Sequence, residues 1–390
     1  MEKHEEAGLF NSFEQLYSLP EDYEPVRPDY FDVQRIHLSK GSLDTEARRN
    51  FIERICALYP ESEIVRCPDL PHNRIKIGKG DIPEIHRKGK TTLVFGVLGT
   101  PVRFSEEEGN TCPNYWHFST TGFCFYGCKY CYLSGTQGVW YSPTVKIYLN
   151  LDEILKKIDT IASRLSQPTA FYLGKLQDGL ALDPLTAYST VLVPFFARHP
   201  FARQVLLTKS ADVDRLLQLE HGGHTILSWS LNPPEIARRF EENTPSVEER
   251  LNAMKRCAEK GYPVRAVLMP LIRTRDWKEQ YGEFLREILS HLSLQRLTLG
   301  GICSYRNAKK LMDLKLGTGN AISDWIRNDD PSGDGRLRYS PELRIEMYSH
   351  LVEIALEIQP DLDVALCLEE TRIWESVKLE KNIGRCNCVL

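Results

Sequence analysis

The stretch Phe123-Cys-Phe-Tyr-Gly-Cys-Lys-Tyr-Cys-Tyr-Leu133 carries three cysteines at the spacing C-x3-C-x2-C. It comes shortly after the predicted strand Tyr115–Phe118. Three thiols in one short loop can wrap three irons of a cubane cluster and leave the fourth iron open. We therefore predict that a [4Fe-4S] cluster is held by Cys124, Cys128 and Cys131.

Other interpretations of these thiols are a structural zinc site or three incidental cysteines. Zinc prefers four protein ligands, and no second C-x2-C stands nearby. Cys112 could be a fourth ligand, but its neighbour Pro113 and its place before the strand favour a loop thiol. An open iron can chelate the amino and carboxylate groups of S-adenosylmethionine (SAM), and electron transfer then yields a 5′-deoxyadenosyl radical. The loop thus predicts radical SAM chemistry.

The composition fits a globular protein with one large domain and appendages, or with two domains. The chain has 390 residues, 42% of them hydrophobic, and a net charge of -4. This charge gives no global basic field, so any contact with nucleic acid would need a local patch. The sequence shows no secretion signal and no apolar stretch that could span a membrane, so we expect a cytoplasmic protein. Eleven cysteines then suggest thiols and metal ligands rather than disulfides.

Strands and helices alternate after Tyr115, which predicts an α/β fold with parallel strands. We expect a partial, open (βα)6-type TIM-like barrel with its chemistry at the carboxyl ends of the strands. Residues 1–110 would form an N-terminal subdomain with a loosely held start of about 25 residues. Residues 111–303 would form the core, and 304–390 a substrate-side extension that ends in a cysteine-containing tail. The predicted strands are Tyr115–Phe118, Thr144–Leu149, Ala170–Leu173, Val205–Thr208, Thr225–Ser230, Val264–Met269, Arg296–Ile302 and Asp363–Cys367.

Three helix starts are marked by capping signals. Asn150 is a predicted N-cap with Glu153 three residues later, and Ser246 with Glu249 forms a second capping pair. Ser340-Pro341 predicts the start of a long amphipathic helix.

The segment Cys128-Lys-Tyr-Cys-Tyr-Leu133 resembles the spore photoproduct lyase family of radical SAM enzymes. The resemblance continues through Leu207–Ser210, Ser228–Asn232, the stretch after Glu242 with Arg250, and Ala365–Glu370. Members of that family repair a methylene-bridged thymine dimer by abstracting a hydrogen atom from it. The resemblance implies a barrel of the radical SAM type, a [4Fe-4S] cluster, SAM, an electron donor such as flavodoxin or ferredoxin, and damaged DNA as a partner.

The resemblance also suggests which residues contact SAM. Tyr130 would lie near the adenine, and Lys209 would hold the carboxylate through its fixed positive charge. Ser230 and Asn232, at the end of another strand, would make further polar contacts to SAM. The best candidates for binding the methionine amine are Gln177 and Asp178.

One departure from the family concerns the thiol that returns a hydrogen atom to the product radical in the lyase. Lys175 stands at the matching position, and ammonium N–H bonds are poor hydrogen-atom donors compared with a thiol. Another thiol would have to act, and the candidates are Cys303, Cys367 and Cys388. We expect Cys303 and Cys367 at the carboxyl ends of strands. Cys386 and Cys388, in a tail expected to be exposed, could be a redox couple, cluster ligands or idle.

A second departure lies in the segment 330–339, where the lyase presents a lesion-binding hairpin. Arg336, Arg338 and Tyr339 could contact a phosphate or stack on a base, and Tyr132 would border the substrate. Asp330 and Asp334, however, would repel a DNA backbone. Both departures favour a changed substrate.

Three functional alternatives therefore stand beside lesion repair. The first is radical modification of another nucleotide, a peptide or a small metabolite. The second is a non-catalytic iron–sulfur protein that senses redox state or transfers electrons. The third is a protein that binds damaged DNA without turnover, with an affinity that falls steeply with salt.

Overall fold

An eight-stranded sheet forms the centre of the structure, a computed structural model that describes residues 17–329 and 333–390. Its order is β15-β12-β11-β10-β9-β8-β5-β4, and its strands run parallel except for β4. Within the described residues β15 and β4 do not pair, so the sheet stays open. The predicted α/β class is confirmed. The bounds are β4 Val102–Ser105, β5 Tyr115–Phe118, β8 Thr169–Leu173, β9 Ala202–Thr208, β10 Thr225–Ser230, β11 Val264–Leu271, β12 Arg296–Gly301 and β15 Val364–Leu366.

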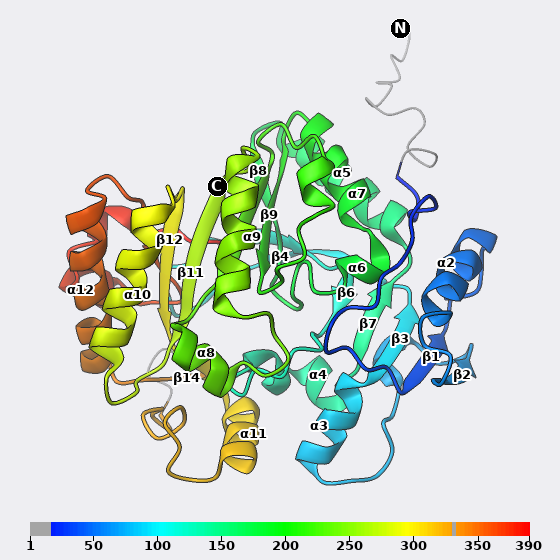
Figure 1. Ribbon diagram of the computed structural model, residues 1–390, viewed down its shortest axis with the longest axis horizontal. Coiled ribbons are helices and arrows are strands. Elements are labelled where there is room, and N and C mark those ends of the chain that lie inside the picture. The colour runs from blue at the N-terminus through cyan, green and yellow to red at the C-terminus, as the bar shows by residue number, and fades with distance from the viewer. Residues whose placement is uncertain (1–16, 330–332) are drawn as a thin grey trace, which may run out of the picture.

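Helices pack against the outer face of this sheet, as Figure 1 shows for α5, α7, α9, α10 and α12. None of the described helices is long and apolar enough to cross a membrane. Their bounds are α2 Glu46–Cys56, α3 Ile82–Lys90, α4 Gln137–Tyr141, α5 Leu151–Leu165, α6 Asp183–Thr186, α7 Ser189–Arg198, α8 Pro234–Phe240, α9 Val247–Glu259, α10 Trp277–His291, α11 Arg306–Leu316, α12 Pro341–Ile358 and α13 Thr371–Ser376.

A second sheet has the order β2-β1-β3-β7-β6. Its strands are β1 Arg35–Ser39, β2 Glu63–Cys67, β3 Thr92–Gly96, β6 Thr121–Gly122 and β7 Val145–Tyr148. We expected β7 in the central sheet, but it pairs with β3 of this N-terminal sheet. The cysteine loop therefore lies between β6 and β7, two paired strands of this N-terminal sheet, and not between strands of the central sheet. The domain limits stay a prediction. A separate hairpin pairs β13 Cys303–Tyr305 with β14 Arg336–Arg338.

The capping signals mark helix starts correctly. Ser246 and Glu249 form the complete capping box of α9, and the Ser340 side chain caps α12. Asn150 precedes α5 but its side chain does not cap the helix. Its amide oxygen accepts from the backbone N–H of Leu98 at 3.0 Å, and its amide nitrogen donates to Glu153 at 2.8 Å. Asn150 thus ties α5 to the segment after β3.

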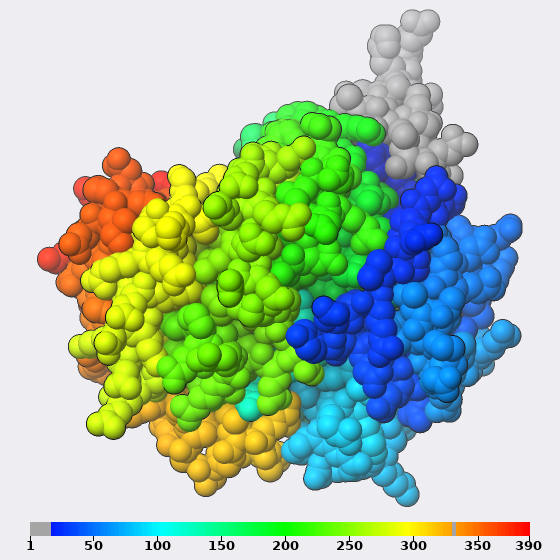
Figure 2. Space-filling model, in the orientation of Figure 1, coloured from blue at the N-terminus to red at the C-terminus, as the bar shows by residue number. Residues whose placement is uncertain are grey.

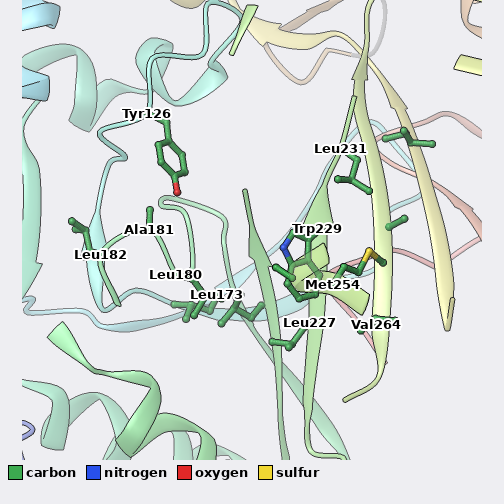
Figure 3. Packing of buried hydrophobic residues seen from close by; sticks show 14 of the residues in the cluster. Tyr126, Leu173, Leu180, Ala181, Leu182, Leu227, Trp229, Leu231, Met254 and Val264 are labelled. Atoms are coloured by element: carbon green, nitrogen blue, oxygen red, sulfur yellow. The ribbon is translucent and has the colours of Figure 1, made fainter. Parts of the chain in front are cut away.

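The alternation along β10 separates the core from the cavity. Leu227 and Trp229 are buried on the face covered by α9, close to Met254 in Figure 3. Ser228 and Ser230 alternate with them and therefore point to the inner face. Apolar side chains on the outer face of the sheet pack against the helices. The polar side chains of the strand therefore face the interior of the open barrel.

The segment after residue 17 runs along the surface of the central part of the chain, as Figure 2 shows. Tyr17 and Leu19 are buried, and the Tyr23 hydroxyl donates to the carbonyl of Leu185 at 2.8 Å. The Val26 N–H donates to the carbonyl of Pro184 at 2.9 Å. Our expectation of a loosely held start is therefore wrong for residues 17–25, because their apolar side chains are buried. Residues 1–16 and Asp330 lie outside the described residues.

Candidate active site

The cysteine loop is fixed to the segment between α8 and α9. The Gly127 N–H donates to the Glu242 carbonyl at 2.7 Å, and the Lys129 N–H donates to Phe240 at 2.8 Å. A Cβ at Gly127 would lie 2.9 Å from the Cβ of Glu242, so this approach requires glycine. Lys90 adds bonds from its ammonium to the carbonyls of Cys124 and Tyr126, the second at 2.6 Å. The loop is thus held from both sides.

One cavity joins the cysteine loop to the carboxyl ends of β8 through β11. Its volume is about 170 Å³. It brings together nearly all the residues that we expected to contact the cluster and SAM. The lining includes Cys124, Cys128, Cys131, Tyr130, Tyr132, Gln177, Asp178, Lys209 and Ser230.

Lys209 lies centrally in this cavity. Its ammonium donates to the Ser230 hydroxyl at 2.8 Å and lies 5.7 Å from the ring centre of Tyr130. It forms no ion pair with a carboxylate within 4.0 Å in the described part of the chain. A cation without such a partner beside a cavity suits an anionic ligand group.

Asp178 lines the cavity, but donors from the protein already bind its carboxylate. One oxygen accepts from the Thr208 hydroxyl at 2.6 Å and from the N–H groups of Leu180 and Ala181. The other accepts from the Lys209 N–H at 2.7 Å. Four donors occupy this carboxylate, so we interpret Asp178 as a positioning residue for Lys209. Gln177 is also tied, since its side-chain oxygen accepts from the Thr121 N–H at 2.9 Å.

A buried polar network supports Tyr130 from behind. The Glu241 carboxylate pairs with Arg250 at 2.6 Å and accepts hydrogen bonds from the Tyr130 hydroxyl and from Asn232, the latter at 2.9 Å. Burial would raise the pKa of Glu241, but Lys209, Arg250 and these bonds lower it to about 2. Asn232 is fully buried and does not line the cavity, so its predicted contact with SAM is not supported.

Sequence reasoning missed the role of Glu241. Arg250 had been noted only as part of the family resemblance. Glu241 is the C-cap of α8, in a stretch whose carbonyls also fix the cysteine loop. Nothing in the local sequence, however, indicates that this carboxylate is buried.

A second ion-pair network lies next to Tyr132, whose hydroxyl donates to the Lys175 carbonyl, but its charged members do not line the cavity. Lys175 pairs with Glu107 at 2.8 Å, and Arg336 pairs with the same carboxylate at 2.8 Å. Burial would raise the pKa of Glu107, but the two cations lower it to about 2. Arg336 also pairs with Asp334 at 3.1 Å, and Arg338 contacts the same group. Asp334 is therefore neutralised by arginines, which weakens the repulsion that we expected.

Two predicted substrate tyrosines differ in their surroundings. Tyr132 is 39% exposed, lines the cavity and donates its hydroxyl to the carbonyl of Lys175. Tyr339 is 1% exposed, with its hydroxyl 3.5 Å from the Ile322 carbonyl. We therefore retain Tyr132 at the substrate side, whereas Tyr339 packs in the core and cannot stack on a base.

The candidate hydrogen-atom donors lie in two places. Cys303 is at the start of β13, opposite Arg338. Cys367 lies in a trio of thiols with Cys112 and Cys386, and Cys388 packs in the same buried cluster as Cys386; none of the four lines the cavity. The tail pair Cys386 and Cys388 is only 2% and 9% exposed, so our expectation of exposed thiols is wrong. The tail enters the barrel and is covered by its strands.

A sequence model of the family described as "Spore photoproduct lyase" matches residues 34–309, more than two thirds of the chain. The chain belongs to the spore photoproduct lyase family. It is 30% identical over 214 residues to the spore photoproduct lyase of Clostridium acetobutylicum, covering 54% of this chain and 61% of that protein. It is 29% identical over 220 residues to the spore photoproduct lyase of Bacillus subtilis, a match that covers 56% of this chain and 62% of that protein. The matched regions thus span about three fifths of the length of these curated relatives.

Solved members of the family share the fold. A spore photoproduct lyase mutant with bound AdoMet and dinucleoside spore photoproduct superposes with a TM-score of 0.75 at 22% identity, covering 87% of this chain and 99% of that one. A second structure, "Spore photoproduct lyase complexed with dinucleoside spore photoproduct", superposes with a TM-score of 0.75 at 22% identity. This match covers 87% of this chain and 100% of that one. The expected architecture of the family is therefore confirmed across the central sheet and its extensions.

Proposed function

We propose that this chain is a radical SAM enzyme that abstracts a hydrogen atom from an organic substrate at the open mouth of the cavity. The observation that carries this proposal is the shared cavity of the cysteine loop and Lys209. Three thiols, the Lys209 ammonium and the polar ends of parallel strands line the same space. This combination suits an iron–sulfur cluster together with a zwitterionic, aromatic cofactor.

The donor set fits a [4Fe-4S] cluster rather than a single ion. Cys124, Cys128 and Cys131 line the cavity, and their sulfurs do not gather as a trio within 4.8 Å of one another, as a single ion would require. Three thiolates from one loop leave room for SAM beside them. When bound, the cluster and SAM supply reductive cleavage of SAM and a radical that abstracts hydrogen.

The protein's own residues would bind and orient the cofactor. Lys209 would hold the SAM carboxylate, with Ser230 and the Asp178 carboxylate fixing the lysine from its side-chain and backbone ends. The Tyr130 ring would border the adenine because Glu241 and Asn232 hold its hydroxyl in place. Buried tyrosines around the loop would exclude water.

For the substrate, family membership supports a pyrimidine lesion in DNA, which would have to leave the base stack to reach the cavity. Tyr132 would border it, with Lys175 and Arg336 at the rim. The second candidate substrate is another nucleotide, a peptide or a small metabolite. One observation favours such a substrate over a DNA lesion. Both rim cations are already paired with Glu107, which leaves them less free to hold phosphates. A flavodoxin or ferredoxin as electron donor stays a prediction.

The test is anaerobic reconstitution of the cluster, followed by SAM, dithionite and DNA containing the thymine-dimer lesion. Mass spectrometry would follow 5′-deoxyadenosine and the DNA product. Deoxyadenosine with reversion of the lesion supports repair, and deoxyadenosine with an unchanged lesion supports another substrate. A loaded cluster that gives no deoxyadenosine would refute the proposal and favour a redox or DNA-binding protein.

A further inference from the structure

The last residues of the chain pass through the interior of the open barrel. The carbonyls of Asn387 and Val389 accept from Arg265 at 3.2 and 2.6 Å, and Arg296 donates to the carbonyl of Cys386 at 2.6 Å. The Ser228 hydroxyl donates to the Asn387 side chain at 2.8 Å. Figure 1 marks this end beside the central strands. Inward-facing side chains of three neighbouring strands, β10, β11 and β12, thus hold the tail.

The tail completes a group of four thiols from three distant parts of the chain. Cys112 precedes β5, Cys367 follows β15, and Cys386 and Cys388 lie in the tail. The sulfurs of Cys112, Cys367 and Cys386 all lie within 4.8 Å of one another. Cys388 packs in the same buried cluster as Cys386, with Cys112 against it, but its sulfur lies outside the trio. We name these four residues the floor cysteines.

We propose that the floor cysteines bind one zinc ion in a tetrahedral site made of four cysteine thiolates. Zinc–sulfur bonds of about 2.3 Å place the sulfurs of such a site about 3.8 Å apart, which agrees with this gathering. The three gathered sulfurs, with Cys388 moving in from the same buried cluster as the fourth ligand, would form the soft thiolate set that selects zinc. Two of the ligands come from Cys-x-Cys in the tail, so the ion would also fix the tail inside the barrel.

The surroundings suit a negatively charged centre. Four thiolates and one divalent ion carry a net charge of about -2. Arg265 is 1% exposed and forms no ion pair with a carboxylate within 4.0 Å in the described residues, although buried charges are normally paired. Its guanidinium donates instead to the carbonyls of Asn387 and Val389, the residues on either side of Cys388. The Leu368 N–H donates to the Cys112 sulfur at 3.2 Å, as expected for a ligand thiolate.

This inference does not depend on the proposed radical chemistry, because the floor cysteines are separate from the cysteine loop. It does restrict that chemistry. Cys367 and Cys388, engaged as zinc ligands, could not return a hydrogen atom to a product radical. Cys303 would then be the remaining thiol among the candidate donors.

The first test is metal content after anaerobic purification without added metal. Mass spectrometry should find one zinc per chain in the wild type and in the Cys124→Ala/Cys128→Ala/Cys131→Ala variant, which lacks the loop thiols and should lose its iron. Cys386→Ser/Cys388→Ser should lose the zinc. The matched control Cys56→Ser removes a thiol on α2, outside this group, and should keep it.

The second test needs no substitution and so does not depend on whether a variant folds. Zinc in the wild-type protein would be exchanged for Co²⁺, and the absorption spectrum should show intense sulfur-to-cobalt charge-transfer bands with tetrahedral d–d bands. Wild-type protein with no stoichiometric zinc, iron retained in the variant without loop thiols, or a Cys386–Cys388 disulfide under reducing purification would each overturn the proposal.

Discussion

Breaking the buried ion pair behind Tyr130 should cost far more stability than breaking an exposed pair of similar length. Glu241 and Arg250 lie 2.6 Å apart with both side chains 0% exposed. Lys278 and Glu346 lie 2.7 Å apart with side chains 56% and 51% exposed. The two pairs have similar lengths and differ mainly in burial. Comparing their effects on the free energy of unfolding therefore separates the contribution of burial from that of distance.

The Glu241→Gln substitution keeps the shape of the side chain but leaves Arg250 charged and uncompensated in the interior. Removing one partner of a buried pair typically costs about 3–5 kcal/mol, because the remaining charge stays desolvated. Glu346→Gln should cost less than about 1 kcal/mol, since water screens the exposed pair. The structure therefore predicts a difference of several kcal/mol between two substitutions with the same chemistry.

The assay is urea unfolding followed by circular dichroism and by tryptophan fluorescence, with agreement of the two probes as the check for two-state behaviour. A double-mutant cycle with Arg250→Met isolates the interaction between the two side chains. We expect a coupling energy of about 3 kcal/mol for the buried pair and well under about 1 kcal/mol for Lys278→Met with Glu346→Gln. Equal coupling energies for the two pairs would refute the reasoning.

Three further predictions concern single cations and one carboxylate. Lys209→Met should weaken SAM binding to the reconstituted protein by about 10- to 100-fold in calorimetry, since it removes a charge-assisted bond, while the exposed Lys255→Met should not. Burial lowers the pKa of Lys146 to about 7, so its charged form destabilises the fold. The free energy of unfolding of the wild type should therefore rise relative to that of Lys146→Met between about pH 7 and 10.5. A difference between the two proteins that stays constant over this range would contradict the prediction. Glu107→Gln should destabilise the protein at pH 7. The difference in free energy of unfolding between the two proteins should vanish as the pH falls from about 4.5 toward 2, because Glu107 contributes stability only while it is ionised. Chemical-denaturation curves that show the same difference at low pH would exclude that explanation.

Local spacing was sufficient to determine the cysteine loop, the capped helices and the polar strand ends. Ser246 with Glu249, and the three thiols of the loop, act over a few residues, and their geometry follows from chain connectivity. Lys209 and Ser230 were predicted from the resemblance to the family, and the parallel pairing of β9 with β10 brings the ends of their strands together. For the cysteine loop and the helix caps, the short distance along the chain fixes the distance in space.

Only the tertiary structure decided which polar residues face the cavity and which support it. Asp178 and Asn232 sit beside the predicted SAM contacts in sequence, but their hydrogen bonds point to the protein rather than the cavity. Cys112 and Cys386 come together across most of the chain, and the tail that carries Cys386 is buried by arginines on β11 and β12. Periodicity and motif spacing carry no information on such long-range contacts, because burial and partner choice depend on how whole sheets and segments pack.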